Sequence, residues 1–182
     1  MINQAIEFAT IKHANQMRKG TEIPYILHCL EAGIIAANLT TTKETIDNDV
    51  VSATILHDTI EDADVSYEEL ARTFNKTIAD LVSSQSEDKS KAWIERKTDT
   101  IRLLKENESR AIEIATLADK LSNMRSISKD YDVQKESIWD KFNAGKESQY
   151  WYYNAIAESL TQVQATNEYK EFKDLIQKTF ET

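Results

Sequence analysis

Glycine and proline are scarce in this chain, with three glycines and one proline among 182 residues. Tight turns between β-strands depend on these two residues, because glycine supplies a positive φ angle and proline a fixed one. A sheet of several strands would need more turn residues than this chain has. The sequence therefore predicts an all-α fold, and its length predicts a single domain over residues 1–182 with a sizeable core.

Charge and cysteine content narrow the class of protein. The net charge of −9 argues against general binding to nucleic acid or to an anionic membrane, but not against a small anion on a local basic patch. No apolar run approaches the ~20 residues that span a bilayer, and no signal peptide is visible. The single cysteine, Cys29, excludes an internal disulfide and fits a reducing compartment. We therefore expect a cytoplasmic protein.

Apolar periodicity predicts about eight to ten helices in one bundle. The first should cover residues 1–19, with Gly20 as its left-handed cap. A connection around Pro24 and a polar linker over 40–49 separate it from helices at about 28–39 and 50–62. Further helices are expected at about 66–75, 78–82, 92–106 and 109–127, then, after a polar stretch over 128–146, at 147–164 and 168–181.

Two helix ends carry recognisable capping residues. Ser66 followed by Glu69 forms a capping box at the start of a helix. Asn75 follows the last apolar residue of that helix, and asparagine is the best left-handed cap after glycine. We therefore expect that helix to end at Asn75 in a left-handed conformation.

The segment over residues 51–62 begins apolar and ends in ionisable side chains. Read as one continuous helix, it places Asp58, Glu61 and Asp62 in one sector beside His57. Such groups repel and desolvate one another unless a cation lies among them. A metal site with acid/base carboxylates is one interpretation, and a solvated acidic helix end is the other. The metal site is favoured because His57 directly follows apolar residues that should still enter the core.

A second segment, over residues 112–125, predicts a helix that is buried on most sides. Asp119 lies within its apolar surface, and a lone buried carboxylate is costly unless it is paired or bound to metal. Asp119 is therefore either an ion-pair partner, of Arg18 or Lys12, or a ligand in the site of His57. Asn123 lies one turn further on the same face and could contact a substrate.

The remaining histidines are candidates for the same site. Besides His57 the chain contains only His13 and His28. His13 lies within the first predicted helix, and His28 begins the second, directly after the turn at Pro24. Metal sites usually collect histidine and carboxylate from several elements, so from the residues alone either histidine could join His57.

Three blocks of sequence together resemble a known family. In order, the chain reads Arg18-Lys19-x4-Pro24-Tyr25-Ile26-x-His28, His57-Asp58-x2-Glu61-Asp62 and Leu117-Ala118-Asp119-Lys120-x2-Asn123. This resembles the HD-domain superfamily of metal-dependent phosphohydrolases, and within it the hydrolases of guanosine tetraphosphate (ppGpp), both stand-alone and in stringent-response enzymes. The match is strongest over residues 5–125, and residues 147–182 should form the C-terminal helices of the HD-type bundle.

The resemblance implies a role for each matching position. It implies one divalent ion, usually Mn²⁺, held by His28, His57, Asp58 and Asp119, while His13 matches a position that is not a ligand. Glu61 and Asp62 match the pair that orients and deprotonates the attacking water. Contacts to the nucleotide fall at Arg18, Lys19, Lys97 and Asn123, with Tyr150 near the position of an aromatic residue beside the base.

The activity that this resemblance implies is Mn²⁺-dependent removal of the 3′-diphosphate of ppGpp or pppGpp, leaving GDP or GTP. We expect a hydrolase only, because the family's synthetase module needs far more chain than remains. Two alternatives stay open: an HD phosphohydrolase of an adenosine alarmone or of the 2′-phosphate of NADPH, and an alarmone-binding module without turnover. The partner is a small nucleotide, with no nucleic acid and no membrane, and the sequence leaves a homo-oligomer open.

Overall fold

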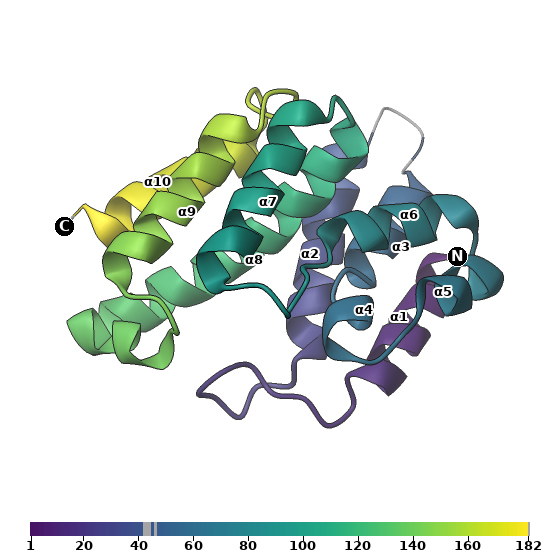
Figure 1. The fold of residues 1–182 in the computed structure, drawn as a ribbon, viewed down its shortest axis with the longest axis horizontal. Coiled ribbons are helices and arrows are strands. Elements are labelled where there is room, and N and C mark those ends of the chain that lie inside the picture. Colours follow the sequence, from purple (N-terminus) through teal and green to yellow (C-terminus); the bar gives the residue numbers. More distant parts are fainter. Residues whose placement is uncertain (42–44, 46, 182) are drawn as a thin grey trace.

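The protein is described by a computed structural model that covers residues 1–41, 45 and 47–181, so the predicted linker over 40–49 lies partly outside the described residues. Within this part of the chain there are ten α-helices, one 3₁₀ helix and no strand, as predicted (Figure 1). None of the described helices combines the length and apolarity needed to cross a membrane. The elements are α1 (Ile2–Lys12), α2 (Ile26–Thr40), α3 (Asn48–Ile55), α4 (Thr59–Asp62), α5 (Tyr67–Thr73), α6 (Lys76–Gln85), α7 (Trp93–Glu106), α8 (Arg110–Gln134), η1 (Lys135–Lys141), α9 (Lys146–Ser159) and α10 (Asn167–Phe180).

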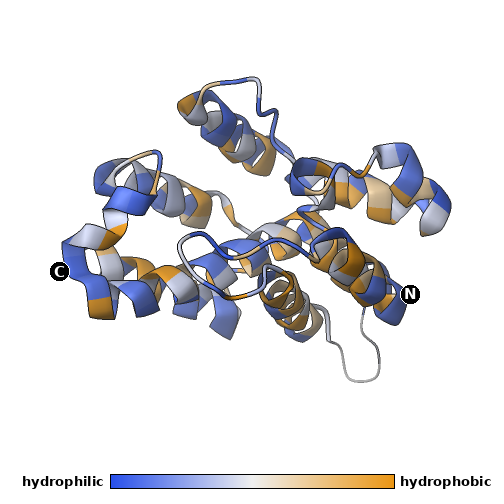
Figure 2. Ribbon diagram, turned by 90° about the horizontal axis from the view of Figure 1, so that it is seen from below, coloured by the Kyte–Doolittle hydropathy of each residue, from blue (hydrophilic) through white to orange (hydrophobic). Residues whose placement is uncertain are grey.

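Helix α8 runs through the middle of the bundle and organises it. It packs against α2, α3 and α6 on one side and against α10 on the other, and the two chain termini lie at opposite ends of the molecule (Figure 1). Apolar side chains are buried along its length, among them Ile114, Leu117, Leu121 and Met124. The apolar faces of the surrounding helices turn inward, and their polar faces turn outward (Figure 2). Residues on α8 therefore lie close to several other elements at once.

Helices α2 and α3 approach each other closely at Gly33. A Cβ atom placed on this glycine would lie 2.4 Å from Cγ1 of Ile55. Only a residue without a side chain fits at that separation. The contact brings the end of α3, which precedes His57, against α2, the helix that carries His28.

The first helix is shorter than predicted, because the chain turns well before residue 19. After α1, the amide of Arg18 donates to the carbonyl of Ile23 (2.8 Å), and the amide of Tyr25 donates to the carbonyl of Gln16 (2.8 Å). These bonds close an irregular hairpin between α1 and α2. Gly20 does adopt a positive φ (74°), but as the turn of this hairpin rather than as a helix cap.

The predicted helix over 50–62 is also wrong, because it is broken at residues 56–58. The Nδ1 atom of His57 lies 2.8 Å from the carbonyl oxygen of Thr54, and the hydroxyl of Thr59 donates to the carbonyl of Leu56 (2.7 Å). Both side chains occupy carbonyls that a continuous helix would use for its own hydrogen bonds. As a result His57 and Asp58 lie in a tight turn between α3 and α4.

The two predicted caps differ in outcome. Ser66 caps α5 by accepting from the amide of Glu69 (3.0 Å), although the Glu69 carboxylate pairs with Lys12 (3.0 Å) rather than closing the box. Asn75 is not left-handed: its φ of −166° is extended, and its side chain accepts from the amide of Ile78 (2.8 Å) at the start of α6. Asparagine serves there as an N-cap, the other position that it favours.

Candidate functional site

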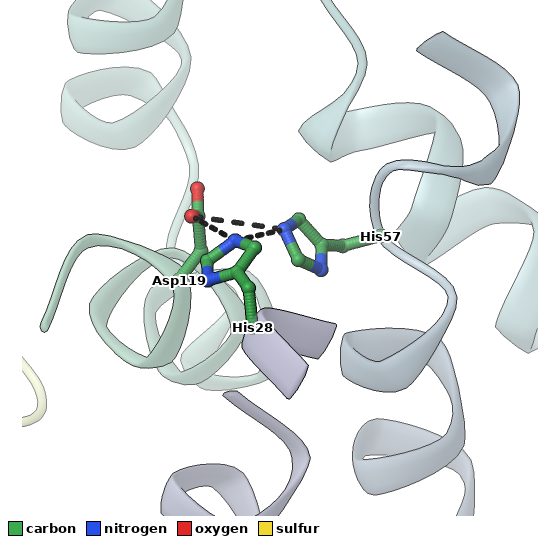
Figure 3. Close-up of side chains that lie close together, drawn as sticks. All are labelled: His28, His57 and Asp119. Atoms are coloured by element: carbon green, nitrogen blue, oxygen red, sulfur yellow. Dashed lines mark hydrogen bonds and ion pairs between the residues drawn. The ribbon is translucent and has the colours of Figure 1, made fainter. Parts of the chain in front are cut away.

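Two histidines and an aspartate converge in the core, as Figure 3 shows. His28 comes from the first turn of α2, His57 from the turn after α3, and Asp119 from the middle of α8. The two Nε2 atoms are 3.2 Å apart, and Oδ1 of Asp119 lies 3.2 Å from Nε2 of His28 and 3.6 Å from Nε2 of His57. All three residues are buried. Their ligand atoms lie within 4.8 Å of one another, close enough to share one metal ion.

Asp58 adjoins these three residues. We call His28, His57, Asp58 and Asp119 the metal-ligand group, after the ligands that the resemblance predicts. The Oδ2 atom of Asp58 lies 2.9 Å from Nε2 of His57 and 3.7 Å from Nε2 of His28. The hydroxyl of Tyr25 donates to the same oxygen (2.6 Å). The structure thus brings together all four positions that the resemblance assigned as ligands.

The hydrogen bonds behind the two rings fix which nitrogen can bind a metal. A carbonyl only accepts, so Nδ1 of His57 donates to Thr54 (2.8 Å), and Nδ1 of His28 lies 2.8 Å from the hydroxyl of Ser122. In neutral rings bonded in this way, Nε2 carries a lone pair. Two lone pairs and two carboxylates directed at one point suit a divalent cation. This donor set fits Mn²⁺, Fe²⁺ or Zn²⁺ better than Ca²⁺.

The electrostatics of the group also favour positive charge at its centre. Burial lowers the pKa of His28. Burial acts the same way on His57, but the nearby carboxylates of Asp58 and Asp119 outweigh it and raise the pKa of that imidazole. For Asp119, burial opposes ionisation, yet Lys120 and the two histidines hold the pKa of its carboxyl well below the usual value. The carboxylates therefore stay ionised and attract a cation.

The two carboxylates of α4 have different surroundings. Glu61 is half-buried and accepts from the backbone amide of Glu87 (3.1 Å), and burial raises the pKa of its carboxyl. The exposed Asp62 forms an ion pair with Lys89, whose ammonium also donates to the carbonyl of Glu61 (2.8 Å). A raised pKa brings the Glu61 carboxylate closer to the working pH of a general base.

A basic cleft of about 310 Å³ lies beside the metal-ligand group. Arg18 donates to the amide oxygen of Asn123 (3.1 Å), and the amide nitrogen of Asn123 donates to Oδ1 of Asp119 (2.6 Å), which joins the cleft to the ligands. The cleft gathers four of the five predicted substrate-binding residues. Its lining includes Arg18, Lys19, Lys97, Lys120 and Asn123, with the rings of Tyr25, Trp93, Tyr152 and Tyr153.

The cations on α7 are paired with a carboxylate from the loop before it. Lys97 and Arg96 both contact Glu87, at 2.7 and 3.1 Å, and Lys97 also lies over the ring of Tyr152 (4.8 Å to its centroid). Burial and the neighbouring Lys120 lower the pKa of Lys97. Lys97 lines the cleft, so an anionic ligand there would compete with Glu87 for it.

Tyr150 does not reach the cleft. Its hydroxyl donates to Glu181 (2.7 Å), and its ring packs against Phe180 with the ring centroids 5.4 Å apart. Tyr152 and Tyr153, from the same aromatic run, line the cleft instead. The run of aromatic residues was visible in the sequence, but which of its members face the cleft depends on how α9 packs.

The structure also decides between the alternatives that the sequence left open for Asp119 and His13. Asp119 has a lysine partner, but it is the adjacent Lys120 (2.5 Å) and neither Arg18 nor Lys12. His13 is buried outside the metal-ligand group, where its Nδ1 atom lies 2.7 Å from Oε1 of Gln16. The resemblance assigned it no ligand role, and the geometry places it accordingly.

Sequence reasoning did not single out two polar residues that hold the ligands. Tyr25 contacts Asp58, and Ser122 contacts His28. Spacing could have indicated both, because each lies three residues from a ligand, Tyr25 before His28 and Ser122 after Asp119. Residues at that spacing in a helix lie on the same face.

A family model described as HD domain matches residues 5–148. The chain is 35% identical over 127 residues to guanosine-3′,5′-bis(diphosphate) 3′-pyrophosphohydrolase MESH1 of Danio rerio, covering 69% of this chain and 68% of the relative. It belongs to the HD-domain family of these pyrophosphohydrolases. The human MESH1 is 34% identical over 127 residues, covering 69% of each chain. The Aquifex aeolicus enzyme is 32% identical over 128 residues, which are 69% of this chain and 18% of that longer protein.

Solved structures support the same membership of the HD-domain family. One, described as a metazoan ortholog of SpoT that hydrolyzes ppGpp, superposes with a TM-score of 0.79 at 25% identity, covering 97% of this chain and 93% of that one. A protein of Listeria monocytogenes superposes with a TM-score of 0.75 at 28% identity, covering 85% and 99%. The first match extends over nearly the whole chain, so it includes the C-terminal helices.

Proposed function

We propose that this chain hydrolyses guanosine alarmones, converting ppGpp to GDP and pppGpp to GTP with release of pyrophosphate. The observation that carries the proposal is the metal-ligand group of two imidazoles and two carboxylates. Glu61 and Asp62 follow it on α4, and Asn123 joins it to the basic cleft. The relatives named for this activity, and the related structure described as hydrolysing ppGpp, support the choice of substrate.

The proposed metal is Mn²⁺, held by His28, His57, Asp58 and Asp119. When bound, the ion supplies Lewis acidity that polarises a phosphoryl oxygen and favours deprotonation of water. The protein holds the ligands in place from behind, through Thr54 and Ser122 for the two rings and Tyr25 for Asp58. Their side chains therefore need little rearrangement to receive the ion.

Glu61 and Asp62 act on the attacking water in this proposal. Glu61 accepts its proton, because burial raises the pKa of that carboxyl toward the working range of a general base. Asp62, fixed by its ion pair with Lys89, orients the water. The bond that breaks joins the 3′-oxygen of the ribose to the adjacent phosphorus, so that the ribose hydroxyl is restored.

The basic cleft binds the rest of the substrate. Arg18, Lys19 and Lys97 neutralise the phosphates, and Asn123 connects the substrate to the metal side of the site through Asp119. Guanidinium and ammonium groups are suited to this task because their charge-assisted hydrogen bonds to phosphate are strong. The local basic patch also accounts for anion binding by a chain whose net charge is −9.

The proposal also covers the cellular location of the protein and its domain organisation. We propose a cytoplasmic hydrolase that acts as one domain over residues 1–182. The single cysteine is free and buried, which suits a reducing compartment.

A product analysis tests the proposed function. Purified protein is incubated with Mn²⁺ and, separately, with ppGpp, pppGpp, the adenosine analogue or NADPH, each with an EDTA control, and the products are separated by anion-exchange chromatography. We expect pyrophosphate and GDP or GTP, released only without EDTA. Turnover of the adenosine analogue or NADPH alone would overturn the guanosine assignment. Binding of ppGpp without any turnover would favour a binding module.

A further inference from the structure

A series of hydrogen-bonded side chains holds the His28 ring on the side away from the other three residues of the metal-ligand group. The Nδ1 atom of His28 lies 2.8 Å from the hydroxyl of Ser122, and both residues are buried. The Ser122 hydroxyl in turn donates to Oε2 of Glu31 (2.8 Å). A serine hydroxyl has one proton, and here that proton is given to the Glu31 carboxylate. Ser122 must therefore accept from His28, which places a proton on Nδ1 and the lone pair on Nε2.

This series of hydrogen bonds continues to the C-terminal helix, α10. The second carboxylate oxygen of Glu31 accepts from Arg125 (3.0 Å), and Arg125 makes two further bonds to Glu171 on α10, both of 2.7 Å. This series of hydrogen bonds begins at a buried ring and ends at half-exposed charges, of which Glu31 and Arg125 line a second cleft of about 290 Å³. Glu171 lies beyond residues 5–148, which the family model matches.

The ring of His57 is held in another way. Nδ1 of His57 donates to the backbone carbonyl of Thr54, three residues earlier in the same turn. No side chain is needed for that bond, so no side-chain substitution removes it directly. At Nδ1, therefore, His28 is held by a side chain and His57 by the backbone.

We propose that Ser122 and Glu31 are positioning residues of the metal centre, which hold His28 with Nδ1 protonated and Nε2 directed at the ion. The inference rests on the proposed metal-dependent function. Without the Ser122 hydroxyl, the ring loses the acceptor that fixes its tautomer, and the Nε2–H form competes. Without Glu31, the Ser122 proton is free to turn toward the ring. Outer partners of metal-bound histidine are typically worth ~10–100-fold in metal affinity.

Mn²⁺ titration of the full chain by isothermal calorimetry, after removal of metal with a chelator, measures this effect. We expect Ser122→Ala and Glu31→Ala each to weaken Mn²⁺ binding by ~10–100-fold. Glu31→Gln should recover part of the loss, because its amide oxygen can still accept from Ser122. The matched control is Ser52→Ala: Ser52 is also a buried helical serine, but within the described residues its hydroxyl has no hydrogen-bond partner.

The tautomer itself gives a second measurement that general loss of packing would not change. The chain has three histidines, so the ring ¹⁵N signals of metal-free protein can be assigned by substitution. We expect His28 of the wild type to show a protonated Nδ1 and an unprotonated Nε2. In Ser122→Ala and Glu31→Ala the two nitrogens should become more alike, and His57 should keep its wild-type signals.

The outcomes separate this inference from the proposed function. Wild-type protein that binds no Mn²⁺ would overturn both. Wild-type protein that binds Mn²⁺, with Ser122→Ala and Glu31→Ala equal to it in affinity and in His28 ring signals, would overturn the positioning role alone. An equal loss in Ser52→Ala would also overturn it. Should Ser122→Ala fail to fold, Glu31→Ala decides, because the Glu31 side chain is 39% exposed and tolerates truncation.

Discussion

The metal-ligand group and the basic cleft lie side by side, joined by Asn123, but their side chains are held in different ways. Each ring of the metal-ligand group is fixed from behind by a neutral partner, Thr54 for His57 and Ser122 for His28, so the binding atoms remain directed at one point. In the cleft, Lys97 is instead neutralised by a carboxylate, that of Glu87. One region is arranged before its ligand arrives, and the other must exchange partners when the ligand binds.

This difference indicates which property each region controls. Changes in the metal-ligand group should act on metal affinity and on turnover, because the ligands are preorganised and buried. Changes in the cleft should act mainly on substrate affinity. A phosphate that binds Lys97 must displace the ion pair with Glu87, and part of the gain is lost in breaking that pair.

The largest effect should follow from removing a ligand. His57→Ala should weaken Mn²⁺ binding by more than ~100-fold, since even the loss of an outer partner costs ~10–100-fold, and activity should disappear. Calorimetric titration and product analysis measure the two effects. The matched control is His13→Gln, because His13 is a buried histidine outside the group. Unchanged Mn²⁺ affinity in His57→Ala would contradict the assignment of the group.

Replacing the proton acceptor should separate turnover from metal binding. Glu61→Gln keeps the shape and the hydrogen bond from Glu87 but removes the basic oxygen. We expect kcat to fall by ~10²–10⁴-fold, the usual contribution of a general base, while the Mn²⁺ dissociation constant stays unchanged. Both are measured on the same preparation. A Glu61→Gln variant that turns over normally would remove Glu61 from the mechanism.

A substitution in the cleft should change mainly KM. Lys97→Ala removes one charge-assisted contact, worth roughly 1.5–3 kcal/mol for a hydrogen bond to a charged group, or about 10–100-fold in kcat/KM. Most of this loss should appear in KM, with Mn²⁺ affinity unchanged. Lys105→Ala, a basic residue at the other end of α7 and outside this cleft, is the control. A loss confined to kcat would move Lys97 from the cleft to the chemistry.

The pH dependence of activity should reflect the protonation of the Glu61 carboxylate. Burial raises the pKa of Glu61, and a protonated Glu61 cannot accept a proton. Activity should therefore be lost as the pH falls through that raised pKa, at a pH above the ordinary glutamate value of about 4.3. The measurement is kcat/KM against pH with Mn²⁺ saturating. An acid limb at or below the ordinary value would argue against Glu61 as the base.

The smallest effect is expected at Tyr150. Tyr150→Phe removes only a hydrogen bond to Glu181 outside the cleft, so KM and kcat should change by less than about twofold, as is usual for substitutions away from a site. Tyr152→Phe is the comparison, because Tyr152 lines the cleft between Lys97 and Lys120. A large rise in KM for Tyr150→Phe would show that the Tyr150 hydroxyl contacts the substrate.

Scarce turn residues predicted the all-α fold, and the resemblance of short motifs to a known family named the four residues that converge. The sequence did not predict the turn at residues 56–58. Apolar periodicity there is helical, and the break comes from side chains of His57 and Thr59 that take backbone carbonyls. The conformation of Asn75 was equally ambiguous, since asparagine serves both as an N-cap and as a left-handed cap.

The features that the sequence did not predict depend on tertiary packing. The aromatic run on α9 contains neighbouring tyrosines, and only the docking of that helix decides that Tyr152 rather than Tyr150 lines the cleft. In the same way Ser122, Glu31 and Arg125 come together only because α2, α8 and α10 meet. Contacts between elements distant in sequence leave no periodic pattern in either one.

The distribution of the ligands over α2, the turn after α3 and α8 has a consequence for how the protein matures. No short stretch of the chain can hold the ion alone, so an unfolded chain should bind it weakly, and metal capture follows folding. By mass action, free Mn²⁺ at 100 times its dissociation constant would add about 2.7 kcal/mol to the stability of the native state. A cell short of the metal ion would then hold molecules that are folded, inactive and closer to unfolding, so metal supply would set the lifetime of this protein as well as its activity.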